Sequence, residues 1–403
     1  MSLRTDGITT GVTGGRWRAS VTSFGSVEPW STNTLGTRAT VDWHIAADDR
    51  WHSPRSEATV RQRRVNGTPV VETRVRIPDG DAVQCVYSVA DHGGLTIIEV
   101  ANESPLPIAV AFTSAELLSE RLPSAPIAGI SLPPESVAFP IGHHASLTVA
   151  IPHSARAPGV FPTGLASRLP AAAAVARGWI ATVDRAGRLL LPESGLCDRV
   201  IAARCELALC GPPTATDDPA GCLLAIDQLV RMGESAGPWL PELAHALELA
   251  AKSPDESWVL SAALAAADRV LAVAGESRAR RDLALVRSTL PRAAELPEQS
   301  PAESSRLLAQ VEQRLVVLRD GGAQLLCGGL PSTWIGVNFE VFGLPTDATG
   351  TISFAVRWHG DRPAILWEQV PGKDGPVGLS SPVLAPQWTT SEVKGEALWS
   401  ALG

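Results

Sequence analysis

The sequence predicts a multidomain α and β protein, with an N-terminal antiparallel β-sandwich, central α-helical hairpins and a small C-terminal antiparallel β domain. Three observations predict it. Short segments of alternating apolar and polar residues, separated by turn residues, fill about the first 190 positions. The apolar spacing changes to three and four residues between 195 and 319, and alternation returns after 320. We therefore expect domains over 1–192, 193–320 and 321–403.

The N-terminal part is expected to be a sandwich because its strands are short and its turns are regular. The pairs Asn66-Gly67 and Asp79-Gly80 separate alternating segments, and such pairs favour hairpin turns because both residues tolerate a positive φ. They predict a four-stranded antiparallel meander from about residue 57, with a fifth strand in LPIAVAF (106–112). Further short strands are predicted in SVAFPI, SLTVAI and ARGWIATV.

The central part is predicted to contain six helices with short connections, which is typical of helical hairpins. Asp218 followed by Pro219 is a helix-start signal, and Ser253 to Glu256 is another. Single acids on these helices, such as Asp198, Glu206 and Asp227, are expected on solvated faces or as caps. The six helices are listed by their sequences: LCDRVIAARCELALC, GCLLAIDQLVRMG, WLPELAHALELAAK, SWVLSAALAAADRVLAVAG, SRARRDLALVRSTL and SSRLLAQVEQRLVVL.

The C-terminal part is predicted to return to strands, with glycines and Pro363 supplying turns. The strands are expected in AQLLCGG, WIGVNFEVFGL, GTISFAVRWHG and PAILWEQV. The tail that follows is expected to be loop, with at most one final short strand.

Composition and charge exclude several classes of function. The net charge of −8 argues against a nucleic-acid partner, which normally needs a basic surface. There is no apolar stretch of about 18 residues and no signal-peptide pattern at the N-terminus. We therefore expect no membrane partner and a cytoplasmic location. The six cysteines match no zinc spacing, so neither a metal nor another cofactor is predicted.

The densest group of chemically capable residues lies in the C-terminal part. If WIGVNFEVFG is one strand, Trp334, Asn338 and Glu340 share a face, while Val337 and Phe339 point into the core. A tryptophan beside amide and carboxylate groups can hold a sugar ring. An ordinary solvent-facing strand is the alternative. The proposed substrate-binding residues are Trp334, Asn338, Arg357, His359 and Trp367, together with Trp43 in the N-terminal part.

Glu340, Asp361 and Glu368 are the candidate catalytic residues, because glycoside hydrolysis needs a pair of carboxyl groups. One would protonate the leaving oxygen and the other would act as base or nucleophile. Asp361 also suits the turn HGDRP for backbone reasons alone, so a structural role stays open.

A second group lies between Asp42 and His52, where two tryptophans, two histidines and three acids fall within 11 residues. A sugar-binding loop, packing at the sandwich edge and a metal-dependent enzyme all remain open here, although the spacing resembles no zinc or calcium loop.

The order sandwich, helical hairpins, small β domain resembles that of six-hairpin glycosidases and the related disaccharide phosphorylases. The segment TIIEVANESPLPIAVAF (96–112) looks like a strand pair of their supersandwich. Those families have 12 helices, whereas six are predicted here. The resemblance implies a carbohydrate-active protein, or a degenerate relative that binds without cleaving. The C-terminal residues also resemble the ends of uncharacterised actinobacterial proteins.

Two functions therefore compete. The first is a carbohydrate-binding or carbohydrate-active protein, glycoside hydrolase-like if an enzyme, with a cleft lined by tryptophan and carboxylate between the C-terminal β part and the helices or the sandwich. The second is a non-catalytic scaffold that binds a protein partner, or a second copy of itself, through an apolar patch on the helical domain.

Overall fold

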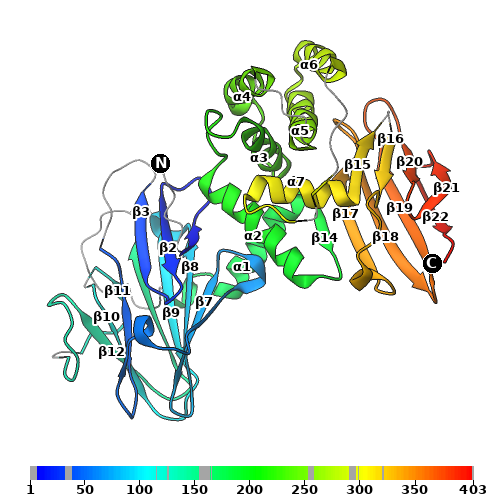
Figure 1. Ribbon diagram of the computed structural model, residues 1–403. Coiled ribbons are helices and arrows are strands. Elements are labelled where there is room, and N and C mark those ends of the chain that lie inside the picture. The colour runs from blue at the N-terminus through cyan, green and yellow to red at the C-terminus, as the bar shows by residue number, and fades with distance from the viewer. Residues whose placement is uncertain are drawn as a thin grey trace. The chain divides into compact units, whose positions relative to one another are not determined.

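The mixed fold predicted from the sequence is confirmed in a computed structural model, which has N-terminal antiparallel sheets, central helices and C-terminal sheets that are largely antiparallel (Figure 1). The chain divides into two compact units, Met1–Ile180 and Ala181–Gly403. The central helices and the C-terminal strands belong to the same unit, and the three-domain boundaries stay a prediction. The structure describes residues 7–31, 39–114, 116–124, 127–153, 164, 166–252, 258–289, 296–297, 299–319 and 322–401.

The first unit contains three antiparallel sheets among its described residues. The three-stranded sheet has the order β1 (Gly7–Gly11), β2 (Trp17–Thr22), β3 (Val27–Ser31). The four-stranded sheet has the order β12 (Val137–Ile141), β10 (Ile108–Phe112), β4 (Trp43–Ala46), β5 (Trp51–His52). The six-stranded sheet has the order β11 (Leu118–Ser119), β13 (Ser146–Pro152), β9 (Leu95–Asn102), β8 (Gly80–Val89), β7 (Val71–Ile77), β6 (Arg61–Arg64).

The predicted meander is confirmed, because β6 to β9 are consecutive neighbours in the six-stranded sheet. Asn66 and Asp79 have φ values of 50° and 57°, which is the left-handed conformation that the turn signals require. The fifth predicted strand, β10, joins the four-stranded sheet instead.

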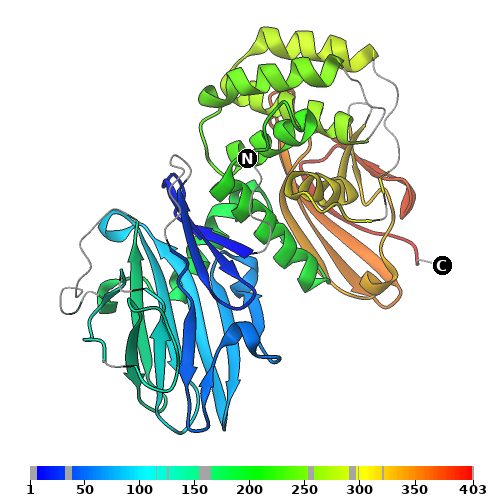
Figure 2. The ribbon, with the colours of Figure 1, turned by 60° about the vertical axis from the view of Figure 1, so that its left-hand side comes forward.

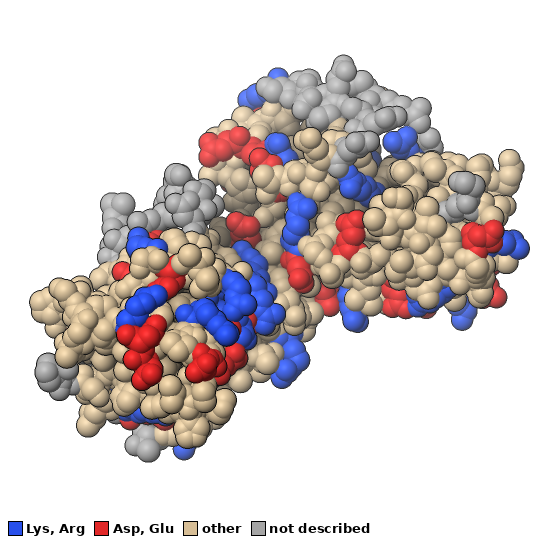
Figure 3. All heavy atoms as spheres, turned by 60° about the horizontal axis from the view of Figure 1, so that its bottom comes forward, with Lys and Arg blue, Asp and Glu red and all other residues tan. Residues whose placement is uncertain are grey.

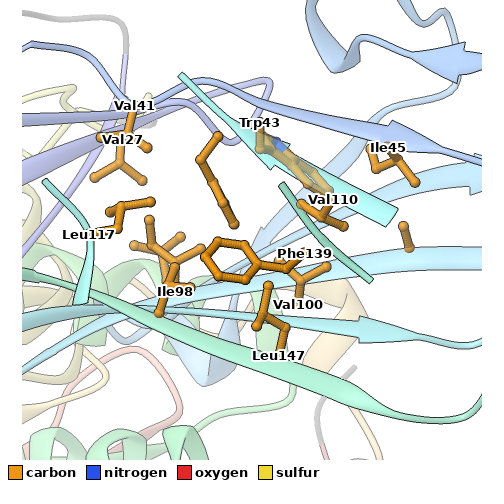
Figure 4. Close-up of a cluster of buried hydrophobic side chains, with 14 of the residues drawn as sticks. Val27, Val41, Trp43, Ile45, Ile98, Val100, Val110, Leu117, Phe139 and Leu147 are labelled. Carbon is orange, nitrogen blue, oxygen red and sulfur yellow. The ribbon is translucent and has the colours of Figure 1, made fainter. Parts of the chain in front are cut away.

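The sandwich core consists of apolar side chains from all three sheets of the first unit (Figure 4). Trp43 and Ile45 from β4 face Ile98 and Val100 from β9, and each is buried. The apolar residues of the alternating sequence pattern are therefore the ones that point into the core.

The six-stranded sheet is also covered on its second face, by helix α1 (Ala172–Val183). Ala172, Val175 and Ala176 pack with Tyr87 and Ile97 of the sheet. The prediction of a strand in ARGWIATV was therefore wrong. The β-branched end of that segment suggested a strand, but its apolar residues recur at helical spacing.

The second unit begins with a short strand and then forms the six predicted helices. Asp218 caps α3 as predicted, since its Oδ1 accepts a hydrogen bond from the Gly221 N–H at 3.0 Å. The start signal at Ser253 to Glu256 lies outside the described residues. The helices are α2 (Ser194–Cys210), α3 (Pro219–Arg231), α4 (Leu240–Lys252), α5 (Trp258–Ala274), α6 (Ser277–Thr289) and α7 (Ser304–Leu315).

Two sheets complete the second unit, and its helices lie together along one flank of them (Figures 1 and 2). The five-stranded sheet has the order β14 (Arg188–Leu190), β17 (Phe339–Pro345), β18 (Thr351–His359), β19 (Arg362–Val370), β22 (Lys394–Leu398). The four-stranded sheet has the order β15 (Val316–Arg319), β16 (Gly322–Leu325), β20 (Gly378–Ser381), β21 (Ala385–Thr390), and its β16–β20 pair is parallel.

Two sequence predictions are corrected here. Val316 to Leu318 were expected to end the last helix, but they form β15, which pairs with β16. β-branched valines favour this extended conformation. The tail was expected to be mostly loop, but it supplies β20, β21 and β22.

Candidate functional site

The predicted face of Trp334, Asn338 and Glu340 does not form, because the strand begins only at Phe339. Trp334 lies in a short 3-10 helix (Ser332–Trp334), and Gly336 has a φ of 82° that breaks the extended run. The Trp334 indole is buried and meets the Phe339 ring edge-on, with centroids 5.2 Å apart. Val337, expected in the core, is 42% exposed. The alternation of side chains between the two faces of a strand therefore does not apply to Trp334, which precedes the strand.

Asn338 and Glu340 are instead bound to β18. The Arg357 guanidinium donates a hydrogen bond to Glu340 Oε1, and the Trp358 backbone N–H donates to Asn338 Oδ1 at 3.0 Å. His359 is exposed at the end of β18. These polar groups are arranged as ordinary cross-strand contacts of a sheet.

Two of the proposed sugar-binding tryptophans are buried, and their indole N–H groups already have acceptors. Trp43 is 1% exposed in the sandwich core, and its indole N–H donates to the Phe24 carbonyl at 2.9 Å. Trp367 is 7% exposed, meets Trp388 edge-on and donates to the Glu392 carbonyl at 3.1 Å. Packing and hydrogen bonding already satisfy each ring, and a ligand contact at either one stays a prediction.

The three predicted carboxylates lie apart. Glu340 is on β17 and Glu368 on β19, with β18 between them and a further offset of two residues in the register. Standard strand spacing puts their backbones on the order of 12 Å apart. Asp361 is exposed in the β18–β19 turn. A catalytic role for these residues stays a prediction.

The Asp42–His52 group is connected by pairwise contacts. His52 Nε2 lies 2.9 Å from Asp49 and its Nδ1 lies 3.2 Å from Glu57, while His44 contacts Ser53 at 2.9 Å. The hydrogen bond from His52 lowers the pKa of Asp49. Burial lowers the pKa of His44. Within the described part of the chain, no three histidine, cysteine or acidic residues are grouped as metal ligands.

A large cavity lies inside the second unit and has a volume of about 1180 Å³. Its wall comes from helices α3, α5 and α7, from β15 and β16, and from the loop at 326–331. Both tryptophans in the wall, Trp258 and Trp334, are mostly buried, at 8% and 5% exposed. Polar groups also line it, including Gln228, Gln313 and Gln324. Cavities of this size hold small molecules in many proteins.

Trp334, a residue of the cavity wall, has an unpaired hydrogen-bond donor. Its Nε1 is buried and has no acceptor among the described residues. Buried indole N–H groups normally find a partner, so this one is a candidate donor to a ligand.

A buried network of charges lies beside the cavity, and its two carboxylates belong to the cavity wall. Asp227 accepts two hydrogen bonds from Arg269, at 2.9 and 2.7 Å. Glu312 accepts from Arg204 at 3.0 Å and from Arg231 at 2.8 Å. Such bidentate and charge-assisted bonds hold both carboxylates in one geometry.

The arginines also fix the ionisation of Glu312. Burial alone would raise its pKa, but Arg231 and Arg204 outweigh burial and lower the pKa to about 2. Arg204 is itself 1% exposed and donates further hydrogen bonds to the carbonyls of Val183, Ala186 and Gly187. Glu312 is therefore a carboxylate at any physiological pH.

Sequence reasoning missed most of this site. Trp334 was singled out, but for a different surface. Asp227 was expected on a solvated face and is instead 2% exposed. One local signal for an ion pair was present in the sequence, because Asp227 and Arg231 are four positions apart on a predicted helix. In the structure their charged groups lie 3.6 Å apart.

Comparison with known proteins identifies no relative: no protein-family model matches the chain, and no curated protein matches it. No helix in the described ranges combines the length and apolar character needed to cross a bilayer. On the face drawn in Figure 3, basic and acidic side chains lie interspersed and form no single basic field.

Proposed function

We propose that the chain binds a carbohydrate in the cavity of its second unit. The observation that carries this proposal is the Trp334 indole, which lines the cavity and has an unpaired buried N–H. Sugar rings stack their C–H faces on indoles, and their hydroxyls accept and donate hydrogen bonds. Trp258 supplies a second ring, and Gln313 and Gln324 supply amides in the same wall.

The proposed activity is binding, and hydrolysis is not part of it. Hydrolysis needs one carboxyl group that carries a proton near neutral pH. Asp227 and Glu312 are both held by arginines, and the pKa of Glu312 is about 2. Glu312 is therefore ionised near neutral pH and has no proton to donate as a general acid.

A thermal-shift screen against mono-, di- and oligosaccharides tests the proposal. A sugar at 100 times its Kd should stabilise the fold by roughly 2.7 kcal/mol and raise the melting temperature by a few degrees. Trp334→Phe keeps an aromatic ring but removes the N–H, and it should weaken binding of that sugar. Trp388→Phe is the matched control, because Trp388 does not line the cavity. No shift with any sugar, in a protein that melts cooperatively, would refute the proposal.

The second candidate function is that of an interaction protein, and the open face of the five-stranded sheet favours it. Four apolar side chains, on four of its strands, are 38–49% exposed there: Leu190, Phe342, Leu366 and Leu398. Exposed apolar groups on one sheet face can bind a second copy of the chain. Light scattering of wild type and Leu366→Lys tests this: a dimer that becomes a monomer supports it, and a monomeric wild type contradicts it. The partner surface expected on the helices stays a prediction.

A further inference from the structure

The wall of the large cavity is rich in arginine, although the whole chain carries a net charge of −8. Four arginines line the cavity against three acids, and two more arginines, Arg204 and Arg231, lie directly behind Glu312. Two of the three acids already pair with arginines: Asp227 with Arg269, and Glu312 with Arg231. The third acid, Glu193, is exposed. This local surplus of positive charge favours an anionic ligand.

Two of the lining arginines have no acidic partner among the described residues. Arg269 binds Asp227, and Arg314 donates to the Pro297 carbonyl at 2.8 Å. Arg287 and Arg319, in contrast, form no ion pair with any described residue, and both are exposed to solvent. Guanidinium groups that are free of carboxylates present their planar forks to phosphate or carboxylate ligands.

Arg287 and Arg319 line the large cavity and also a second, smaller cavity of about 260 Å³. Arg287 comes from α6 and Arg319 from the end of β15, so two separate elements bring them to the place where the cavities adjoin. Three acids line the smaller cavity; Asp268 and Asp347 have contacts of their own, and Asp374 is exposed to solvent. Asp268 pairs with Arg280 at 2.7 Å. Asp347 accepts hydrogen bonds from the backbone of its own loop.

We propose that the ligand is an acidic sugar, one that carries a phosphate or carboxylate group, and that Arg287 and Arg319 hold this group where the two cavities adjoin. This inference rests on the proposed carbohydrate function and specifies its ligand class. The sugar ring occupies the large cavity beside Trp334, and the acidic group binds between the two guanidinium groups. Both arginines are solvent-exposed, so added salt weakens this part of the binding.

Isothermal titration of the full chain tests the inference. The probes are glucose, mannose and galactose, their 6-phosphates, the corresponding uronic acids, and inorganic phosphate alone. We expect at least one acidic sugar to bind about tenfold tighter than its neutral parent. The double variant Arg287→Gln/Arg319→Gln should remove this preference, so that the acidic sugar and its neutral parent bind the variant with similar affinity. The matched control is Arg278→Gln/Arg281→Gln, which removes two exposed arginines of α6 that line neither cavity.

The outcomes separate this inference from the proposed function. An acidic-sugar preference that is lost only in the Arg287/Arg319 variant supports the inference. Equal affinity for neutral and acidic sugars overturns it but leaves carbohydrate binding intact. Inorganic phosphate that binds as tightly as the sugar phosphates overturns it as well, since the sugar then contributes nothing. If no sugar of any kind binds, both the inference and the proposed function fail. Thermal unfolding of each variant verifies that it is folded.

Discussion

Glu312 is mostly buried and accepts hydrogen bonds from two arginines, so its replacement should destabilise the protein. We predict that Glu312→Gln lowers the free energy of unfolding by about 3 kcal/mol at pH 7, because it leaves Arg204 buried without its carboxylate partner and leaves Arg231 with Asp227 alone. Urea unfolding measures the loss. A variant as stable as wild type would mean that solvent reaches this network.

The same residue should make stability depend on pH. The pKa of Glu312 in the folded protein, about 2, is below its ordinary value of 4.5. The ion pairs therefore contribute fully above about pH 4.5, and their contribution is lost as the pH falls towards 2. We predict that the difference in unfolding free energy between wild type and Glu312→Gln shrinks over this interval. A difference that is constant between pH 7 and pH 3 would contradict the assignment.

At the scale of elements, helix α1 covers the second face of the six-stranded sheet, and Ala176 is its most buried contact there, at 2% exposed. We predict that Ala176→Asp destabilises the first unit by several kcal/mol, because it places an unpaired carboxylate in an apolar interface. Ala173→Asp is the matched control on the exposed side of the same helix. Equal loss in both variants, measured by denaturant unfolding, would show that helix propensity and not packing is responsible.

An element could be predicted from the sequence when the residues that determine it lie close together in the chain. The turns at Asn66 and Asp79 are specified by adjacent residues, and the helix start at Asp218 depends on a hydrogen bond to a residue three positions away. α1 was missed although its apolar residues 172, 175, 176 and 179 have helical spacing, because the Trp-Ile-Ala-Thr-Val segment resembles a strand.

The candidate site was largely beyond the reach of sequence patterns, because its contacts join distant parts of the chain. Asp227 and Arg269 are 42 positions apart, and Arg204 and Glu312 are 108 apart. A carboxylate on a helix looks the same in sequence whether it faces water or a buried arginine. Trp334 was noticed for its residue type, but its place depended on a break in the strand at Gly336.

At the scale of the whole molecule, the two units have separate cores, and this should be visible in unfolding. We predict two calorimetric transitions. Ile98→Ala removes a fully buried side chain from the sandwich core and should lower only one transition. Glu312→Gln should lower only the other, and a bound sugar should raise that same transition. A single transition that both substitutions shift equally would contradict independent units.

The most direct test of carbohydrate binding in the cavity is the NMR signal of the Trp334 indole N–H. Its resonance is assigned by its absence from the spectrum of Trp334→Phe and then followed during titration with the sugar that gives the largest thermal shift. We predict that this resonance moves on binding, because the unpaired N–H acquires an acceptor, while the Trp43 resonance stays in place because that indole is already bonded to the Phe24 carbonyl. A saturating sugar that leaves the Trp334 resonance unmoved would contradict binding in this cavity.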